Sequence, residues 1–161
     1  MNTYVLSVIV ENQPSVLSKI SGLFSRRGYN IHSLTVGPTE DPTLSRMTIV
    51  VKSDKYLLEQ IQKQLNKLVD VIKVTILEPE KSVFRELALI KVSASDPASK
   101  SSITEAVNVF RCNIIDMNPK SMTIEVIGDS GKIEAFINLM RPYGIKKIAK
   151  TGLTALERGT C

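Results

Sequence analysis

The feature that most constrains the fold of this chain is an order of predicted elements that occurs twice. In residues 4–77 a strand is followed by a helix, two strands, a second helix and a last strand. The first helix carries Val16, Ile20 and Leu23 at the spacing of one helical face, and it stops at Gly28, where a C-terminal glycine is expected. This order predicts a ferredoxin-like βαββαβ unit, in which two helices cover one face of an antiparallel sheet.

The first half is predicted to end with a second helix and a last strand. The helix begins at Asp54 and carries an apolar stripe that ends at Leu68. Ile72, Val74 and Ile76 then alternate with their neighbours. The alternation predicts a half-buried strand.

The second half repeats the order after the short polar stretch "EPEKS". "ELALIKVSA", "CNIIDM" and "SMTIEVIG" are typical of strands, a final strand is expected within "IKKIAKTGLTAL", and two helical stripes lie between them. Sequence identity between the halves is slight, so the repeat is one of architecture. The chain is therefore predicted to be an α+β protein of two tandem ferredoxin-like domains, residues 1–78 and 79–161.

The first strand predicts an oligomer. It carries Leu6 and Val8 on one face and Val5 and Ile9 on the other, so both faces of the sheet need cover. Halves of this size bury only a modest fraction of their surface and leave sheet edges open. We therefore expect at least a dimer.

Composition and charge exclude several classes of protein. The chain is 43% hydrophobic and 23% charged, as folded globular proteins are, and no apolar run is long enough to span a bilayer. The start "MNTYVLSVIVEN" lacks the basic region of a signal peptide, so we expect a cytoplasmic protein. The net charge of +5 is spread along the second half among acidic residues, which indicates a solvated surface rather than a nucleic-acid site.

The groups that catalysis or metal binding would need are missing from the sequence. His32 is the sole histidine, and Cys112 and Cys161 stand far apart, so neither a catalytic triad nor a metal cage can be assembled. There is no glycine-rich phosphate loop, and Glu40 and Asp41 lie in a proline-flanked turn. The central strands lack the aromatic residues with which RNA-binding modules of this element order stack bases. The sequence favours a binding role.

The stretch "ENQPSVLSKI" suggests where binding would occur. Pro14 and Ser15 open the first helix, so the N–H groups of Ser15, Val16 and Leu17 should lie free at its positive end and favour a carboxylate. Asn12 either meets the ammonium of an amino acid or simply caps the helix. The stretch alone leaves both interpretations open.

The segment "VENQPSVLSKISGLFSRRGYNIHSLTVGPTEDPTLSRMTIVV" closely resembles the N-terminal ACT domain of the small, regulatory subunit of acetolactate synthase. The blocks "RRGYNI", "SLTV" and "PTEDPTLSRMTI" are far more specific than a general ACT pattern, and the terminal "LERG" is similar too. The resemblance implies a non-catalytic subunit without cofactors of its own. It would raise the activity of a catalytic subunit, which would hold thiamine diphosphate, magnesium and FAD, and confer feedback inhibition by valine in branched-chain amino-acid biosynthesis.

The family also implies a site between the ACT domains of two protomers. By matching position, Asn12, Ser15, Val16 and Leu17 of one protomer would face Asn30 and Ile31 of the other. Domain 1–78 would bind the effector, and domain 79–161, whose corresponding stretch is "SDPASKSS", would serve dimerisation and docking on the catalytic subunit.

One residue departs from the family pattern. Relatives commonly have glycine where this chain has Ser15, and glycine allows the closest approach of a ligand to the backbone. Ser15 is therefore expected to narrow the site or weaken valine binding. The alternative functions are an amino-acid-sensing ACT protein that regulates transcription or a different enzyme, and an acylphosphatase-like enzyme, whose phosphate loop "NQPS" does not supply.

Overall fold

The computed structural model describes residues 1–159, which divide into two compact units. The first unit comprises Met1–Val83 together with the segment from Leu153 onward, and the second comprises Phe84–Gly152. The elements of residues 1–77 are β1 (Asn2–Glu11), α1 (Val16–Arg26), β2 (Ile31–Pro38), β3 (Leu44–Ser53), α2 (Lys55–Asn66) and β4 (Val71–Leu77).

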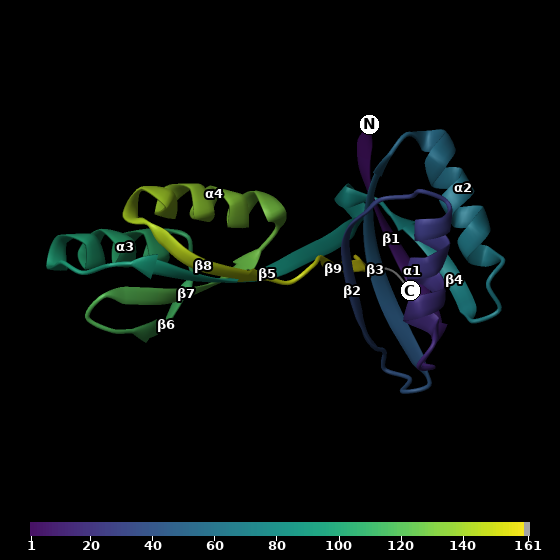
Figure 1. Cartoon of the computed structure of the whole chain (residues 1–161), viewed down its shortest axis with the longest axis horizontal. Helices are drawn as coiled ribbons and strands as arrows, with labels where there is room; N and C mark the ends of the chain where they lie inside the picture. The colour runs from purple at the N-terminus through teal and green to yellow at the C-terminus, as the bar shows by residue number, and fades with distance from the viewer. Residues whose placement is uncertain (160–161) are drawn as a thin grey trace. The chain divides into compact units, whose positions relative to one another are not determined.

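The first unit has the predicted ferredoxin-like fold. Its sheet has the strand order β2-β3-β1-β4, and every neighbouring pair is antiparallel. The helices α1 and α2 lie on one side of this sheet (Figure 1). Alternate residues of β1 and β3 meet the helices in a single core, whose largest fully buried members are Leu6, Ile20, Phe24, Met47, Ile49, Ile61 and Leu65.

One strand departs from the predicted pattern. In β4, Ile72 is 55% exposed, whereas Val71, Val74 and Ile76 pack against the core. The pairing of β1 with β4 shifts between Ile9 and Val10, and such a bulge moves the next side chain to the other face of the strand. The prediction of an alternating strand with Ile72 in phase with Val74 was therefore wrong at its first residue.

The second unit repeats the fold. The elements that follow β4 are η1 (Pro79–Lys81), β5 (Ser82–Ser93), α3 (Pro97–Val109), β6 (Asn113–Met117), β7 (Ser121–Gly128), α4 (Ser130–Met140), η2 (Arg141–Tyr143), β8 (Ile145–Lys150) and β9 (Thr154–Glu157). The strand order β6-β7-β5-β8 is the order of the first sheet, and α3 and α4 lie side by side on one face of it (Figure 1). Ile103 and Val107 of α3 and Ile133 and Phe136 of α4 form the core with the central strands.

The end of the chain differs from the prediction in two ways. The single final strand expected within "IKKIAKTGLTAL" is two strands, β8 and β9. The units divide after Val83 rather than after residue 78, and the segment from Leu153 groups with the first unit rather than with the second.

Hydrogen bonds hold the terminal segment on the first sheet. The hydroxyl of Thr35 donates to the carbonyl of Leu153 at 2.8 Å, and the N–H of Leu153 donates to the hydroxyl of Ser33 at 3.3 Å. Further along, the N–H of Arg158 donates to the carbonyl of Lys81 at 2.7 Å. Leu153 and Ala155 are buried. The face of the sheet away from the helices, for which we expected a partner protomer, is thus covered in part by the chain itself.

Candidate functional site

The loop between β1 and α1 is held by the β2–β3 loop. The N–H of Asn12 donates to the carbonyl of Thr43 at 2.8 Å, and its side-chain Nδ2 donates to the carbonyl of Pro42 at 3.1 Å. Asn12 therefore does not cap α1. Its Oδ1 forms none of the hydrogen bonds found among residues 1–159, and a ligand amino group could donate to it.

The start of α1 has no side-chain cap. Ser15 precedes the helix with φ −93° and ψ −6°, and its side chain forms no capping hydrogen bond. The N–H of Val16 donates to the carbonyl of Gln13 at 3.3 Å, so the prediction that this N–H is free was wrong: the loop closes a turn one residue earlier than a helix start usually does. Within the described part of the chain, the N–H groups of Leu17 and Ser18 make no hydrogen bond.

The other helices are capped by aspartates. Asp54 accepts from the N–H of Leu57 at 2.7 Å before α2, and Asp96 accepts from the N–H of Ser99 at 3.0 Å before α3. Asp129 does the same for α4. Each of these helices thus carries a carboxylate of its own at its positive end, a place that is open at α1.

A small cavity lies beside the open helix start. Its volume is about 50 Å³. Its lining residues are Val10, Glu11, Asn12, Gln13, Val16, Leu17, Val36, Ser45 and Met47. The structure therefore brings together Asn12, Val16 and Leu17 of the predicted site. Sites for small ligands usually enclose about 300–1,000 Å³, so this cavity alone is too small for a complete one.

The other two predicted residues lie at the far end of α1. Gly28 has φ +69°, and the N–H groups of Gly28 and Tyr29 donate to the carbonyls of Ser25 and Phe24, which is the Schellman ending of a helix. Asn30 follows it, and Ile31 begins β2. Because α1 has 11 residues and a helix rises about 1.5 Å per residue, roughly 16 Å separate the two groups within one chain.

Ser15 does not need to be glycine for the backbone to reach this conformation. Its φ of −93° lies in the range that any L-residue adopts, and its side chain is exposed. The departure from the family pattern therefore costs no backbone strain, and any effect of Ser15 would come from its side chain beside the ligand.

Hydrogen bonds and burial shift the pKa of titratable groups in both units. The hydroxyl and the N–H of Thr43 both donate to Asp41, and these bonds lower the pKa of its carboxyl group. His32 is exposed in β2. In the second unit, partial burial raises the pKa of the Cys112 thiol, and Cys161 lies outside the described residues. Across residues 1–159, no three side chains of histidine, cysteine, aspartate or glutamate gather as a metal site would require.

The sequence did not reveal the partners of Asn12. The carbonyls of Pro42 and Thr43 are backbone groups, and nothing in a residue pattern marks which carbonyl an amide will meet. The two prolines that flank Asp41 were the available signal, because they shape the loop that presents these carbonyls. A second and larger cavity of the first unit, described below, was also missed. None of the helices in the described residues is long and apolar enough to cross a membrane.

Comparison with known proteins covers both units. Residues 6–73 match the family described as the AHAS small subunit-like ACT domain, and residues 85–159 match the small subunit of acetolactate synthase. The chain belongs to the acetolactate synthase small-subunit family. Its first unit is the ACT domain of that family, as the sequence motifs predicted.

Individual members of this family are similar over nearly the whole chain. A probable acetolactate synthase small subunit of Methanothermobacter thermautotrophicus is 50% identical over 99% of this chain and 95% of its own length. The acetolactate synthase small subunit of Mycobacterium bovis is 54% identical over 98% and 93%. The crystal structure of the acetolactate synthase small subunit from Thermotoga maritima aligns with a TM-score of 0.92 at 44% identity and covers 100% of both chains.

Proposed function

We propose that the chain is a non-catalytic, cytoplasmic regulatory subunit that activates the catalytic subunit of acetolactate synthase and makes it sensitive to valine. The observation that carries this proposal is the similarity of at least 50% identity to acetolactate synthase small subunits along almost the entire chain. Thiamine diphosphate, magnesium and FAD would be bound by the catalytic subunit. This chain would contribute binding and regulation.

The start of α1 supports the position proposed for the effector. The N–H groups of Leu17 and Ser18 and the positive end of the helix would take the carboxylate of valine, since no side chain of residues 1–159 caps this end. The free Oδ1 of Asn12 would accept from the ammonium group. Val16 and the 45% exposed Leu17 would contact the isopropyl group.

A homodimer would complete this site. The cavity of about 50 Å³ needs further walls, and Leu17 and Val36 stand exposed beside it. Asn30 and Ile31 of a second protomer would supply these walls, because within one chain they lie at the other end of α1. Sedimentation of the isolated subunit tests the dimer, and a monomer in the presence of saturating valine would contradict it.

The second unit would contribute to dimerisation and to docking on the catalytic subunit. Its strands β6 and β7 expose Ile115, Met117 and Ile127. The strand β6 is at the edge of its sheet, and an exposed apolar edge strand can pair or pack with another chain. Ile115→Asp should weaken the assembly of the two subunits without changing the binding of valine to the isolated regulatory subunit.

Inhibition would follow from linkage between valine and the subunit interface. A ligand that bridges two protomers favours the dimer geometry in which Asn12 approaches Asn30, and it inhibits if that geometry activates the catalytic subunit less. Coupling free energies of about 1–3 kcal/mol change an affinity by roughly 5- to 150-fold. The effect of valine on activation should lie in this range.

The decisive experiment measures acetolactate formation by the catalytic subunit alone, with this chain, and with this chain plus valine. We expect stimulation by the chain and a reduction of that stimulation by valine. Absence of stimulation would rule out the proposed function. Stimulation without any valine effect would leave activation standing and remove the feedback role.

Two variants test the residues of the site. Asn12→Ala and Asn30→Ala should each raise the valine concentration for half-inhibition by about tenfold, as the loss of a hydrogen bond to a charged group does. Asn113→Ala is the matched control for Asn30, since Asn113 follows the corresponding helix end in the second unit. If the Asn30 and Asn113 variants behave alike, the site is misplaced while the function remains.

A further inference from the structure

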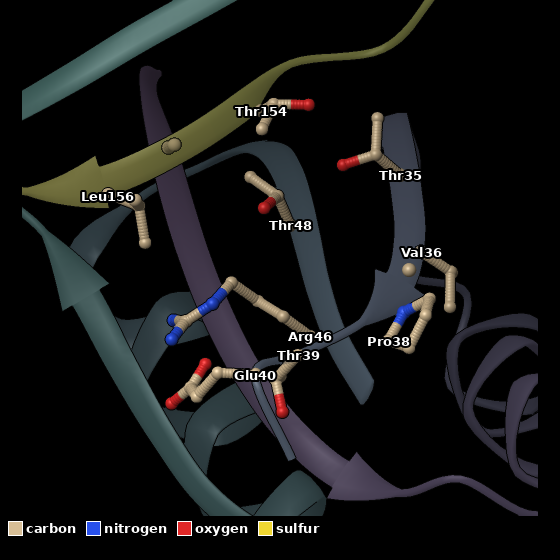
Figure 2. A pocket seen from close by; sticks show the side chains of 11 residues that line it. Thr35, Val36, Pro38, Thr39, Glu40, Arg46, Thr48, Thr154 and Leu156 are labelled. Atoms are coloured by element: carbon tan, nitrogen blue, oxygen red, sulfur yellow. The ribbon is translucent and has the colours of Figure 1, made fainter. Parts of the chain in front are cut away.

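A second cavity of the first unit lies on the face of the sheet away from α1 and α2. Its volume is about 310 Å³, within the range of small-ligand sites. It is bounded by β2 and β3, by the loop that begins at Thr39, and by β9 (Figure 2). Five residues of the block "PTEDPTLSRMTI" therefore line a cavity that the proposed effector site does not use: Pro38, Thr39, Glu40, Arg46 and Thr48.

An arginine without a carboxylate partner lines this cavity. One Nη of Arg46 donates to the hydroxyl of Ser7 at 2.6 Å, which fixes the guanidinium against β1. No carboxylate among residues 1–159 lies within ion-pair distance of it, although the residue is half-buried. A guanidinium has five N–H donors in a planar fork, and this fork matches a carboxylate. Most of these donors are free for a ligand.

A threonine hydroxyl faces the same cavity. Thr48 is only 2% exposed, and its hydroxyl takes part in no hydrogen bond that the described residues make. Its side chain lies between those of Arg46 and Thr154 (Figure 2). A hydroxyl that opens onto the cavity can donate a hydrogen bond to a ligand carboxylate held by Arg46.

The rest of the lining narrows the class of ligand. Leu156, exposed by 56%, and Pro38 place aliphatic surface at the margin of the cavity. Glu40 adds a negative charge that disfavours phosphate and other multiply charged anions. The hydroxyl of Thr35 is occupied by Leu153 and holds the β9 wall in place.

We propose that this cavity binds a short-chain aliphatic monocarboxylate, with its carboxylate on Arg46 and Thr48 and its hydrocarbon chain against Pro38 and Leu156. The site goes beyond the proposed function and does not depend on it. The ligand is either a plain carboxylic acid or an amino acid. The ammonium group of an amino acid would donate a hydrogen bond to the carboxylate of Glu40. Both share the recognition of one carboxylate and one short aliphatic group.

The test is a titration of the full-length chain with four probes, followed by methyl NMR. The probes are 3-methylbutanoate, valine, acetate and inorganic phosphate. We expect 3-methylbutanoate to shift the methyl signals of Thr48, Ala155 and Leu156 and to bind at least fivefold more tightly than acetate, because its additional carbons are buried. Tighter binding of valine that Glu40→Gln abolishes would identify the ligand as an amino acid. Phosphate binding equal to that of 3-methylbutanoate, or no shift with any carboxylate, would overturn the proposal.

Variants connect the binding to the named residues. Arg46→Gln should weaken 3-methylbutanoate at least tenfold, and Arg26→Gln, on exposed α1 surface, should not change it. If Arg46→Gln does not fold, Arg46→Lys, which keeps the charge and loses the fork, should still weaken binding severalfold. Unchanged affinity in a folded Arg46 variant would overturn the proposal. Asn12→Ala should leave these shifts intact, so the two sites can fail separately.

Discussion

The starts of α1 and α3 occupy the same place in two units of one fold, and they differ in what stands before the helix. At α3, Asp96 accepts from both the N–H and the hydroxyl of Ser99, at 3.0 and 2.8 Å. At α1, Ser15 contributes no capping bond. One helix end is closed by the chain's own carboxylate, and the other leaves room for a carboxylate from outside. Two copies of one fold can thus differ in whether a helix start is capped or open.

The units also differ at the ends of these helices and on the second faces of their sheets. Arg111 takes the place of Gly28 with φ +56°, and the N–H groups of Arg111 and Cys112 make the same two bonds as those of Gly28 and Tyr29. On the face away from the helices, Thr48 is buried in the first sheet, whereas Lys147 and Ile127 are exposed in the second. The terminal segment accounts for part of this difference, since Leu153 forms hydrogen bonds with Ser33 and Thr35 of the first sheet.

Among the substitutions that test the difference between the two units, truncation of the Leu153 side chain should have the largest effect on stability. Leu153→Ala should lower the free energy of unfolding of the first unit by about 2–3 kcal/mol, because a buried leucine leaves a cavity. Amide exchange resolved by residue is the measurement, and protection should fall in β2 and β3. Leu156→Ala, at an exposed position of β9, is the control and should change little. Loss of protection confined to the second unit would assign the segment to that unit instead.

Closing the open helix end should have the next largest effect. Ser15→Asp places a negative charge where the valine carboxylate is proposed to bind, so the valine concentration for half-inhibition should rise about tenfold, or ~1.4 kcal/mol. Enzyme assays with the catalytic subunit measure it. Ser15→Asn introduces a side chain of the same shape without the charge. It should raise the valine concentration for half-inhibition much less than Ser15→Asp does. Equal effects of the two variants would show that charge at this helix end does not matter.

Substitutions of Gly28 and Arg111 test the difference between the C-terminal ends of α1 and α3. Gly28→Ala should cost about 1 kcal/mol of unfolding free energy, since alanine is strained at positive φ, and Arg111→Gly should gain up to about 1 kcal/mol by relieving such strain. Urea unfolding measures both. Gly37→Ala serves as a control, because no atom lies within 4 Å of an added Cβ and its φ is not positive. Changes of the same sign at Gly28 and Arg111 would contradict the equivalence of the two helix ends.

Acid should have the smallest effect, through the cap of α3. The hydroxyl of Ser99, and then its N–H, lower the pKa of Asp96 in the folded protein. A carboxyl group whose pKa is lowered on folding stabilises the fold above its unfolded pKa of about 3.9, and this contribution is lost as the pH falls through the folded pKa. The second unit should therefore unfold at a lower temperature below about pH 4. Asp96→Asn should remove part of this pH dependence of its stability. An identical acid profile for the variant would contradict this role.

Much of the fold followed from residue periodicity. The stripes of Val16, Ile20 and Leu23 and of Ile133, Phe136 and Ile137 lie in the cores as expected, and Gly28 ends α1. Such patterns succeed because they depend on one element and on the face that it buries.

The features that the sequence did not predict depend mostly on contacts between segments that are distant in the chain. The bulge that exposes Ile72 arises from the pairing of β4 with β1, and the partners of Asn12 are carbonyls of another loop. The left-handed Arg111 gave no signal because the expected glycine is absent. For the candidate site, the sequence placed Asn12, Val16 and Leu17 beside one cavity, while Asn30 and Ile31 could be connected to it only through the family resemblance.

The return of the chain end to the first sheet makes the second unit an insertion within the first. The chain leaves the first unit after Val83 and comes back at Leu153. A fragment cut near residue 80 would therefore lack the segment that covers Ser33 and Thr35, and its behaviour would report a first unit without that cover. Effector binding, proposed for the first unit, and docking, proposed for the second, can be separated in a variant in which a short flexible linker joins residue 83 directly to residue 153.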